Sequence, residues 1–131
     1  MQPRTGAEVP HDPQLLKGVL SLVLLRLLAE QESYGYQLVT RIHEIGLTGV
    51  AEGTVYPALA RLERERQVTS RLVPSSAGPA RKYYRLTPHG YDALVTAQAT
   101  WEGLAGVVAT LLSRPVPTEP VPAQQAPAKE N

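Results

Sequence analysis

The segment from residue 53 to residue 67, GTVYPALARLERERQ, holds the groups of this sequence best suited to bind a polyanion. The Tyr56 hydroxyl and the Arg61 guanidinium can donate hydrogen bonds to phosphate oxygens and to base edges. Gly53 would let a phosphate approach the backbone at the start of a helix, where free amide groups attract anions. This chemistry points to nucleic acid.

A structural role for the same residues is the alternative. In that interpretation Tyr56 lies in the core, and the arginines form a solvated helix face together with the neighbouring glutamates. We favour the solvated face for Arg64 and Arg66, because adjacent Glu residues offset their charge. For Tyr56 and Arg61 we favour contact with DNA.

Basic residues concentrate in the middle of the chain, although the formal net charge is only +1. From residue 34 to residue 87, eight Lys and Arg stand against four Glu. Between Arg71 and Arg85 there are four basic residues and no acidic one. A surface that faces the DNA backbone needs such a local excess of positive charge.

The sequence gives little support for catalysis or metal binding. The three histidines, His11, His43 and His89, lie far apart, and no acid, nucleophile or phosphate loop accompanies them at a useful spacing. The 131 residues include no Cys, which excludes thiolate metal sites and disulfides and makes a reducing cytoplasm the expected location. We therefore expect no enzyme activity, no metal and no cofactor.

The first element that must position the binding residues is an apolar stretch, residues 14–30, expected to be a helix buried on most sides. Its longest apolar run, Val19 to Ala29, is shorter than the roughly 20 residues that span a bilayer, and it contains Arg26. The residues before it are acidic and contain proline, unlike the basic start of a signal peptide. We expect neither a membrane span nor a signal peptide.

Two further helices are expected before the sequence pattern changes. The second should have Ser33 as its cap and stop at Gly46. Its inner face is expected to hold Leu38, Ile42 and Ile45. The third is the segment that begins at residue 53, and its inner face is expected to hold Val55, Leu59 and Leu62.

The period then changes to that of strands, at residues 68–73 and 81–86. The turn-forming segment PSSAGPA, residues 74–80, separates them, which predicts a hairpin with a long tip. Tyr83 and Tyr84 alternate along the second strand, so one is expected in the core and the other on the outer face.

A final helix is expected to start at Thr87 and Pro88 and to run to about Leu112. Its apolar residues follow the heptad spacing of a helix that packs lengthwise on another: Leu94, Ala97, Trp101, Leu104, Val108 and Leu111. Packing on its own domain would also satisfy this pattern, but we favour a dimer seam.

Three helices, a two-stranded hairpin and a long helix follow in the order of a winged helix-turn-helix, an α+β fold that is mostly α. The expected organisation is a flexible N-terminal arm at residues 1–13, a DNA-binding domain at 14–87, a dimerisation helix at 88–113 and a disordered Pro-rich tail at 114–131. In this fold the third helix enters the major groove and the hairpin, or wing, lies on the backbone.

Three motifs, SYGYQLVTRI at residues 33–42, EGTVYPALARLE at 52–63 and GPARKYYRLTPHG at 78–90, together resemble the PadR family of bacterial transcriptional regulators. With the last helix they cover about three quarters of the chain, and the length resembles that of the short subfamily. The resemblance implies a homodimeric repressor that binds double-stranded DNA and releases it when a small molecule binds.

The matching positions imply a set of DNA-binding residues, to which Arg61 is added from the charge pattern. The set is Tyr34, Gly35, Tyr36, Gly53, Thr54, Tyr56, Pro57, Arg61, Arg81, Lys82 and Tyr83. Three positions bear on local geometry. Ala51 replaces a capping Ser or Thr, Arg66 stands where a Gly is usual after the third helix, and Pro57 is expected to bend that helix.

Trp101, the single tryptophan, lies in the middle of the heptad seam. In some short PadR proteins a tryptophan at this point sandwiches flat hydrophobic compounds across the dimer axis. The resemblance thus implies a ligand and dimer seam formed by Leu15, Gly18, Leu22, Ala93, Leu94, Ala97, Trp101, Leu104, Ala105 and Val108. The effector would be apolar or aromatic. The alternative, a purely structural pair of tryptophan rings, stays open.

Two other functions also remain open at this stage. One is a winged helix that docks on protein, against which the acid-free basic stretch argues. The other is a DNA binder that responds to no effector.

Overall fold

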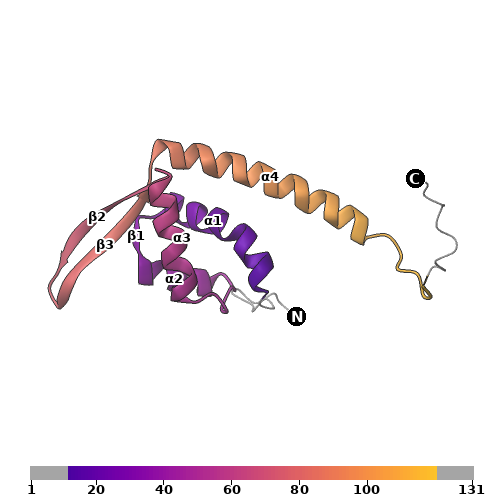
Figure 1. Cartoon of the computed structure of the whole chain (residues 1–131), viewed down its shortest axis with the longest axis horizontal. Coiled ribbons are helices and arrows are strands. Elements are labelled where there is room, and N and C mark those ends of the chain that lie inside the picture. The colour runs from indigo at the N-terminus through magenta and orange to yellow at the C-terminus, as the bar shows by residue number, and fades with distance from the viewer. Residues whose placement is uncertain (1–11, 121–131) are drawn as a thin grey trace, which may run out of the picture. The chain divides into compact units, whose positions relative to one another are not determined.

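The computed structural model describes residues 12–120 and is an α+β structure that is mostly helical, as predicted. Its elements are α1 (Pro13–Glu30), β1 (Ser33–Tyr34), α2 (Gly35–Glu44), α3 (Glu52–Arg64), β2 (Val68–Ser75), β3 (Gly78–Leu86) and α4 (Pro88–Leu112) (Figure 1). The strands form one antiparallel sheet in the order β1-β3-β2. Most of the expected arm and much of the expected tail, residues 1–11 and 121–131, lie outside the described residues.

Helix α1 supplies the largest share of the core. The Asp12 carboxylate caps it by accepting a hydrogen bond of 3.0 Å from the Gln14 amide, and Pro13 occupies the first turn, where no amide donor is needed. Its buried side chains recur at helical spacing: Leu20, Leu24, Leu25, Leu27 and Leu28. The buried side chains all lie from Leu20 onward, whereas Leu15, Lys17 and Gly18 are exposed, so the expected burial on most sides is met only in the second half of the helix.

The start of α2 differs from the prediction. Ser33 is not the helix cap, because it belongs to β1 and pairs with Tyr84 of β3. Its hydroxyl donates to the Gln31 carbonyl at 3.2 Å and accepts from the Arg41 guanidinium at 2.9 Å. The cap position falls on Tyr34, whose amide donates to the Gln37 side chain at 3.4 Å.

The end of α2 is set by Gly46, which has a φ of 113° that side-chain-bearing residues rarely adopt. The helix stops at Glu44, two residues before it. Ile45 was expected on the inner face, but it is 52% exposed because it lies beyond the last helical residue. Leu38 and Ile42 are fully buried, as predicted.

Helix α3 is anchored by the three predicted apolar residues, since Val55, Leu59 and Leu62 are at most 1% exposed. Ala51 is its N-cap and makes no side-chain hydrogen bond, which confirms the weak start. The helix continues through Pro57 to Arg64.

The exit of α3 is a left-handed turn, although Arg66 and not Gly stands there. Arg66 adopts it with a φ of 63°, and the Gln67 amide donates to the Leu62 carbonyl at 2.9 Å. A left-handed conformation costs a side-chain-bearing residue roughly 1–2 kcal/mol relative to Gly. The surrounding hydrogen bonds hold the turn despite this cost.

The wing has a shorter tip than predicted. Pairing of β2 with β3 continues past residue 73 to Ser75 and Gly78, so the long seven-residue tip was wrong. The ladder is irregular between Val73 and Ser75, around Pro74, which an edge strand tolerates because one of its sides needs no donors. Tyr84 is buried and Tyr83 only half-buried, so the predicted alternation is confirmed.

Helix α4 starts and ends where the sequence predicts. The Thr87 hydroxyl accepts a hydrogen bond of 2.9 Å from the Gly90 amide, and its own amide donates to the Gln67 carbonyl at 3.1 Å. A side chain at Gly90 would collide with that carbonyl, so Gly90 allows α4 to start against the base of the wing. One compact unit ends at Ala99 and a second begins at Thr100.

Candidate nucleic-acid interface

Helix α3 presents an exposed surface opposite its buried face. Four residues of the predicted DNA-binding set are exposed on its first two turns: Gly53, Thr54, Tyr56 and Pro57. A Cβ at Gly53 would meet no atom within 4 Å, so the backbone there is open to a ligand. Because the buried face fixes the helix, these exposed groups are presented by a rigid element.

Tyr56 and Gly35 form a close contact that the sequence does not reveal. The Tyr56 ring packs on the backbone of Gly35 so closely that a Cβ there would collide with it. Burial is the main cause that raises the pKa of the Tyr56 hydroxyl, and the negative charge of Glu52 is the second cause. Tyr56 nevertheless remains 42% exposed. Gly35 thus serves to seat Tyr56 between α2 and α3, while neighbouring Tyr36 is 57% exposed.

The two arginines of α3 lie in different surroundings, and only Arg61 departs from the sequence interpretation. Arg61 is half-buried, and its guanidinium donates a hydrogen bond of 2.6 Å to the Ser21 hydroxyl of α1. Arg64, which the sequence assigned to a solvated face, is indeed exposed. Arg61 therefore makes a structural contact in addition to its predicted role at DNA. In the sequence, the polar Ser21 within the apolar stretch of α1 is the feature that could have indicated this contact.

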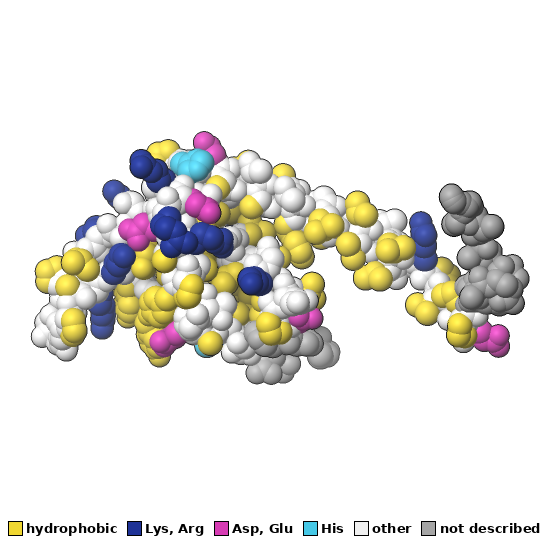
Figure 2. Space-filling model, in the orientation of Figure 1, with side chains coloured by type: hydrophobic (Ala, Val, Ile, Leu, Met, Phe, Trp, Pro, Cys, Tyr) yellow, Lys and Arg dark blue, Asp and Glu magenta, His cyan; other side chains and the backbone are white. Residues whose placement is uncertain are grey.

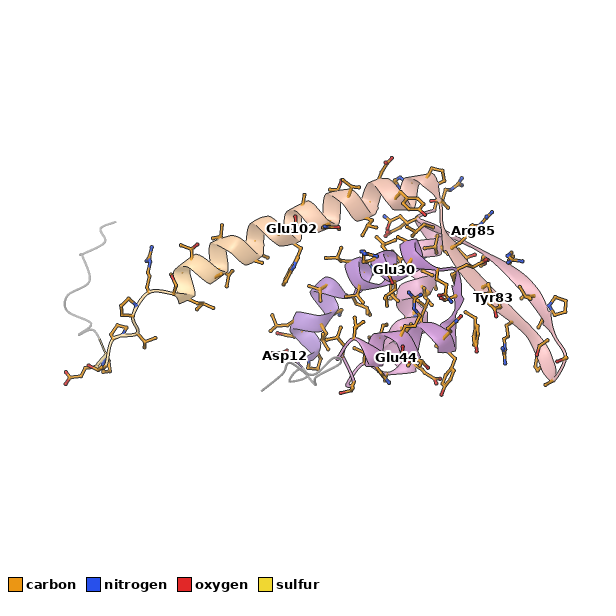
Figure 3. All side chains as sticks on the ribbon, turned by 180° about the vertical axis from the view of Figure 1, so that it is seen from behind. Asp12, Glu30, Glu44, Tyr83, Arg85 and Glu102 are labelled. Carbon is orange, nitrogen blue, oxygen red and sulfur yellow. The ribbon has the colours of Figure 1, made fainter. Side chains whose placement is uncertain are left out.

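Arg81 is held on an aromatic surface where β3 passes β1. Its guanidinium carbon lies 4.6 Å from the centroid of the Tyr34 ring. The Tyr34 and Tyr83 rings meet edge to face, with centroids 5.2 Å apart, and these two residues are paired across the strands (Figure 3 labels Tyr83). This stacking restricts the guanidinium before any ligand arrives, and its charge stays available because cation–π contact does not neutralise it.

Lys82, next to Arg81, has an acidic partner. Its ammonium lies 3.2 Å from a Glu63 carboxylate oxygen, and the Ser70 hydroxyl donates to the other oxygen at 2.6 Å. The hydrogen bond from Ser70, and then Lys82, lowers the pKa of the Glu63 carboxyl, while Glu63 raises the pKa of Lys82. This cluster ties β2 and β3 to α3 through one side chain of each element.

A second acidic residue pairs with the wing further along β2. Arg71 makes two hydrogen bonds to the Glu32 carboxylate, from Nε at 2.7 Å and from the terminal nitrogen at 3.0 Å. This bidentate pair is the main cause that lowers the pKa of Glu32. Neither Glu32 nor Glu63 was predicted at the site, because each lies far along the sequence from the cation with which it pairs.

The cations that remain without a carboxylate partner define the part of the wing available to phosphate. Within residues 12–120, neither Arg81 nor Arg85 lies within ion-pair distance of an acidic group. Arg85 is exposed on β3 (Figure 3). On the face seen in Figure 2, Lys and Arg side chains gather over α3 and the wing. Such an arrangement suits a duplex backbone beside a groove.

The predicted ligand and dimer residues are exposed in part. Leu15 is 73% exposed and Gly18 is exposed on α1, whereas Leu22 is half-buried. On α4, Leu94 is buried and Ala93, Ala97 and Ala105 are half-buried. Trp101, Leu104 and Val108 are 45%, 57% and 41% exposed, and hydrophobic side chains run along this helix (Figure 2).

Among residues 12–120, no group of His, Asp and Glu could hold a metal ion. No helix in this range has the length and apolar character needed to cross a membrane.

Comparison with known proteins assigns the arrangement. Residues 24–96 match the Transcriptional regulator PadR-like family. A PadR-like transcriptional regulator from Bacillus cereus strain ATCC 14579 is 38% identical, with a TM-score of 0.71 over 78% of this chain and 99% of that one. A Streptococcus transcriptional regulator is 34% identical, with a TM-score of 0.69 over 78% and 100% of the two chains.

Two further relatives are more distant in sequence. A PadR family transcription regulator from Clostridium difficile R20291 is 29% identical, with a TM-score of 0.66 over 72% of this chain and 99% of that one. An uncharacterized protein of Lysinibacillus sphaericus is 28% identical over 96 residues, which are 72% of this chain and 88% of that protein. The chain therefore belongs to the PadR-like family of transcriptional regulators, which act by binding DNA and are not enzymes.

Proposed function

We propose that this protein is a homodimeric, cytoplasmic repressor that inserts α3 into the major groove and lays its wing on the neighbouring backbone. The observation that carries the proposal is the joint presentation of an exposed α3 surface and an unpaired wing cation. The Glu63 cluster, at 3.2 Å from Lys82 and 2.6 Å from Ser70, holds the two elements together. A fixed spacing between them is what recognition of groove and backbone together requires.

Roles within this interface follow from the contacts. Thr54, Tyr56 and Arg61 are proposed to contact base edges or the groove wall, with Gly53 and Pro57 beside the backbone. Arg81 is proposed to bind phosphate or to enter the minor groove, since it is stacked on Tyr34 at 4.6 Å and has no acidic partner among the described residues. The remaining proposed contacts are Tyr34, Gly35, Tyr36, Lys82 and Tyr83.

Dimerisation is proposed to use the exposed apolar row of α4. Leu104, Val108 and Leu111 are 57%, 41% and 53% exposed in the single chain, and their heptad spacing is typical of helices that pack lengthwise. Trp101, 45% exposed in the same row, is proposed to meet its copy across the dimer axis and to bind an apolar or aromatic effector. Binding there would lower the affinity for the operator.

The test is fluorescence anisotropy of a labelled duplex from upstream of the protein's own gene, against a scrambled duplex of equal length at one fixed salt concentration. We expect at least a hundredfold preference for the native duplex, which corresponds to about 2.7 kcal/mol. Equal, weak binding to operator candidates across the genome would contradict a sequence-specific repressor. Sedimentation velocity of the same sample tests the dimer, and titration of planar aromatic compounds into the complex tests release.

A further inference from the structure

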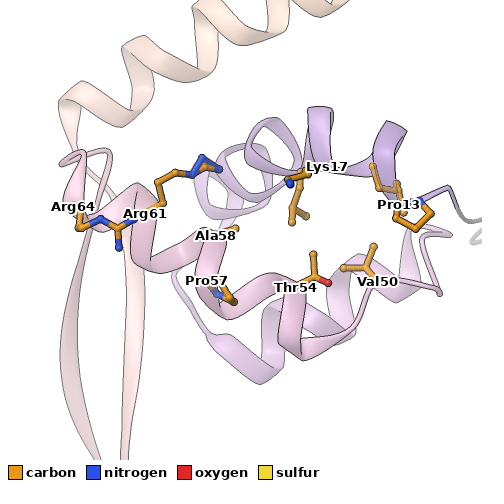
Figure 4. Close-up of a pocket in the computed structure, with 10 residues that line it drawn as sticks. Pro13, Lys17, Val50, Thr54, Pro57, Ala58, Arg61 and Arg64 are labelled. Carbon is orange, nitrogen blue, oxygen red and sulfur yellow. The ribbon is translucent and has the colours of Figure 1, made fainter.

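A groove of about 530 Å³ between α1 and α3 has an apolar floor that neither DNA binding nor dimerisation through α4 explains. Its floor is aliphatic and includes Leu16 and Leu20 of α1, Val50 of the preceding loop and Ala58 of α3. Figure 4 shows Val50 and Thr54 on one side of the groove and Lys17 on the other. The volume lies within the range of small-molecule sites, roughly 300–1,000 Å³.

The charged side chains that line the groove are all positive. Lys17, Arg61 and Arg64 contribute to its lining, and no Asp or Glu does. Arg61 is held in place by its 2.6 Å hydrogen bond to Ser21. Among residues 12–120, no carboxylate forms an ion pair with any of these three cations.

Cations above an aliphatic floor match an amphiphilic anion. We propose that the groove binds a medium-chain aliphatic carboxylate, with its chain on Leu16, Leu20 and Ala58 and its carboxylate toward Lys17 and Arg61. An aliphatic tail fits because no aromatic ring lines the groove, so a flat aromatic compound would find nothing to stack on. A DNA phosphate fits less well, since it would be desolvated against apolar side chains without gaining from them.

The position of the groove links it to the recognition helix. Thr54 and Pro57, both in the proposed DNA interface, form one wall of the groove. A ligand seated there contacts α3 and neutralises cations beside the duplex, so it lowers the affinity for DNA, and DNA lowers the affinity for the ligand by the same factor. This coupling rests on the proposed function, whereas binding of the carboxylate to the free protein does not.

Calorimetric titration of decanoate, kept below its micelle concentration, into the full chain tests the binding step. We expect one site per chain, and we expect Lys17→Gln to weaken binding roughly two- to fivefold, as for an exposed ion pair. Arg26→Gln is the matched control, because it removes the same charge from α1 outside the groove and should leave decanoate binding unchanged. Circular dichroism confirms that each variant is folded.

Two probes with the same tail separate the groove from general hydrophobic binding. Decanol should bind more weakly than decanoate, and decyltrimethylammonium should not compete with it. Equal binding of all three probes, or equal loss of affinity in Arg26→Gln and Lys17→Gln, would overturn the groove as an anion site.

Anisotropy of the protein–operator complex then tests the coupling. Release by decanoate in the wild type, with the required concentration raised in Lys17→Gln, supports it. Decanoate binding without any change in operator affinity would overturn the coupling and leave the site itself standing. If no duplex is bound specifically, that result counts against the proposed function and not against the groove, since the calorimetric titration contains no DNA.

Discussion

Arg81 and Lys82 are neighbours on β3, yet their charges have different partners. The Arg81 guanidinium stacks 4.6 Å from the Tyr34 ring, whereas the Lys82 ammonium lies 3.2 Å from the Glu63 carboxylate. Because each phosphate contact contributes about 0.9 to the slope of log affinity against log salt, Arg81→Gln should flatten that slope by about 0.9. Between about 50 and 200 mM salt, the advantage of the wild type over this variant should shrink about 3.5-fold.

Lys82→Gln should change the slope by less than half of that amount. Lys82 must give up its pairing with Glu63 to bind a phosphate, and an exposed ion pair of this kind is worth roughly 0.2–1 kcal/mol. Glu63→Gln removes that cost, while its amide oxygen can still accept the Ser70 hydrogen bond that ties β2 to α3. It should therefore raise affinity for any duplex by roughly 1.4- to 5-fold. Lys82→Gln and Glu63→Gln thus change the affinity for DNA in opposite directions, although both break the same ion pair.

Anisotropy titrations with the specific and scrambled duplexes, at several salt concentrations between about 50 and 200 mM, measure the slopes. Both duplexes should show the same slope change, because a phosphate contact carries no sequence information. Urea unfolding of each variant serves as the control for folding. An unchanged slope in Arg81→Gln, or equal slope changes in Arg81→Gln and Lys82→Gln, would refute the division of roles between these cations.

Four other changes test the structure. Gly35→Ala should lower the free energy of unfolding by about 1–3 kcal/mol, because its Cβ collides with the Tyr56 ring, and Tyr56→Ala should relieve much of that loss in the double variant, as read by urea unfolding. Arg66→Gly should raise the free energy of unfolding by about 1 kcal/mol, since Gly accepts a φ of 63° without strain; an unchanged urea midpoint would contradict this. The lowered pKa of Glu63 means that its contribution to stability is complete above its ordinary value of 4.5 and is lost as pH falls through the lowered value. The raised pKa of Lys82 makes its contribution complete below 10.5 and lost as pH rises through the raised value. Urea unfolding across pH should show both losses of stability in the wild type. In Glu63→Gln, the loss of stability that Glu63 causes at acidic pH should be absent. Trp101→Ala should loosen the dimer or abolish binding of aromatic compounds, and sedimentation and fluorescence titrations that show neither change would remove Trp101 from the seam.

Local sequence determined most of the elements. The leucine spacing of α1, the apolar triad of α3 and the Thr87–Pro88 start of α4 each encode their element through side chains only a few residues apart. Periodicity also separated Tyr84, which is buried, from Tyr83 on the other face of β3. Such signals are readable because helix and strand periods act within one segment.

Local sequence did not determine which residues meet across segments. The sequence predicts that Ser33 caps α2, but in the structure Ser33 pairs with Tyr84 in the sheet and is not the cap. The sequence predicts a hairpin tip of seven turn-forming residues, but in the structure the pairing of the two strands extends to Ser75 and Gly78. In the first case, backbone hydrogen bonds to a strand far along the chain outweighed the local propensity. In the second, the pairing of two neighbouring strands continued into the segment whose residues favour a turn.

The charges of the site show the same division. The positions of charged residues along the sequence located the excess of basic residues in the middle of the chain, because counting charges over a segment needs no knowledge of how it folds. Only the tertiary structure paired Lys82 with Glu63 and Arg71 with Glu32, and so left Arg81 without a carboxylate partner among the described residues. Ion pairs act over a few ångströms in space, and those distances do not exist until the chain has folded.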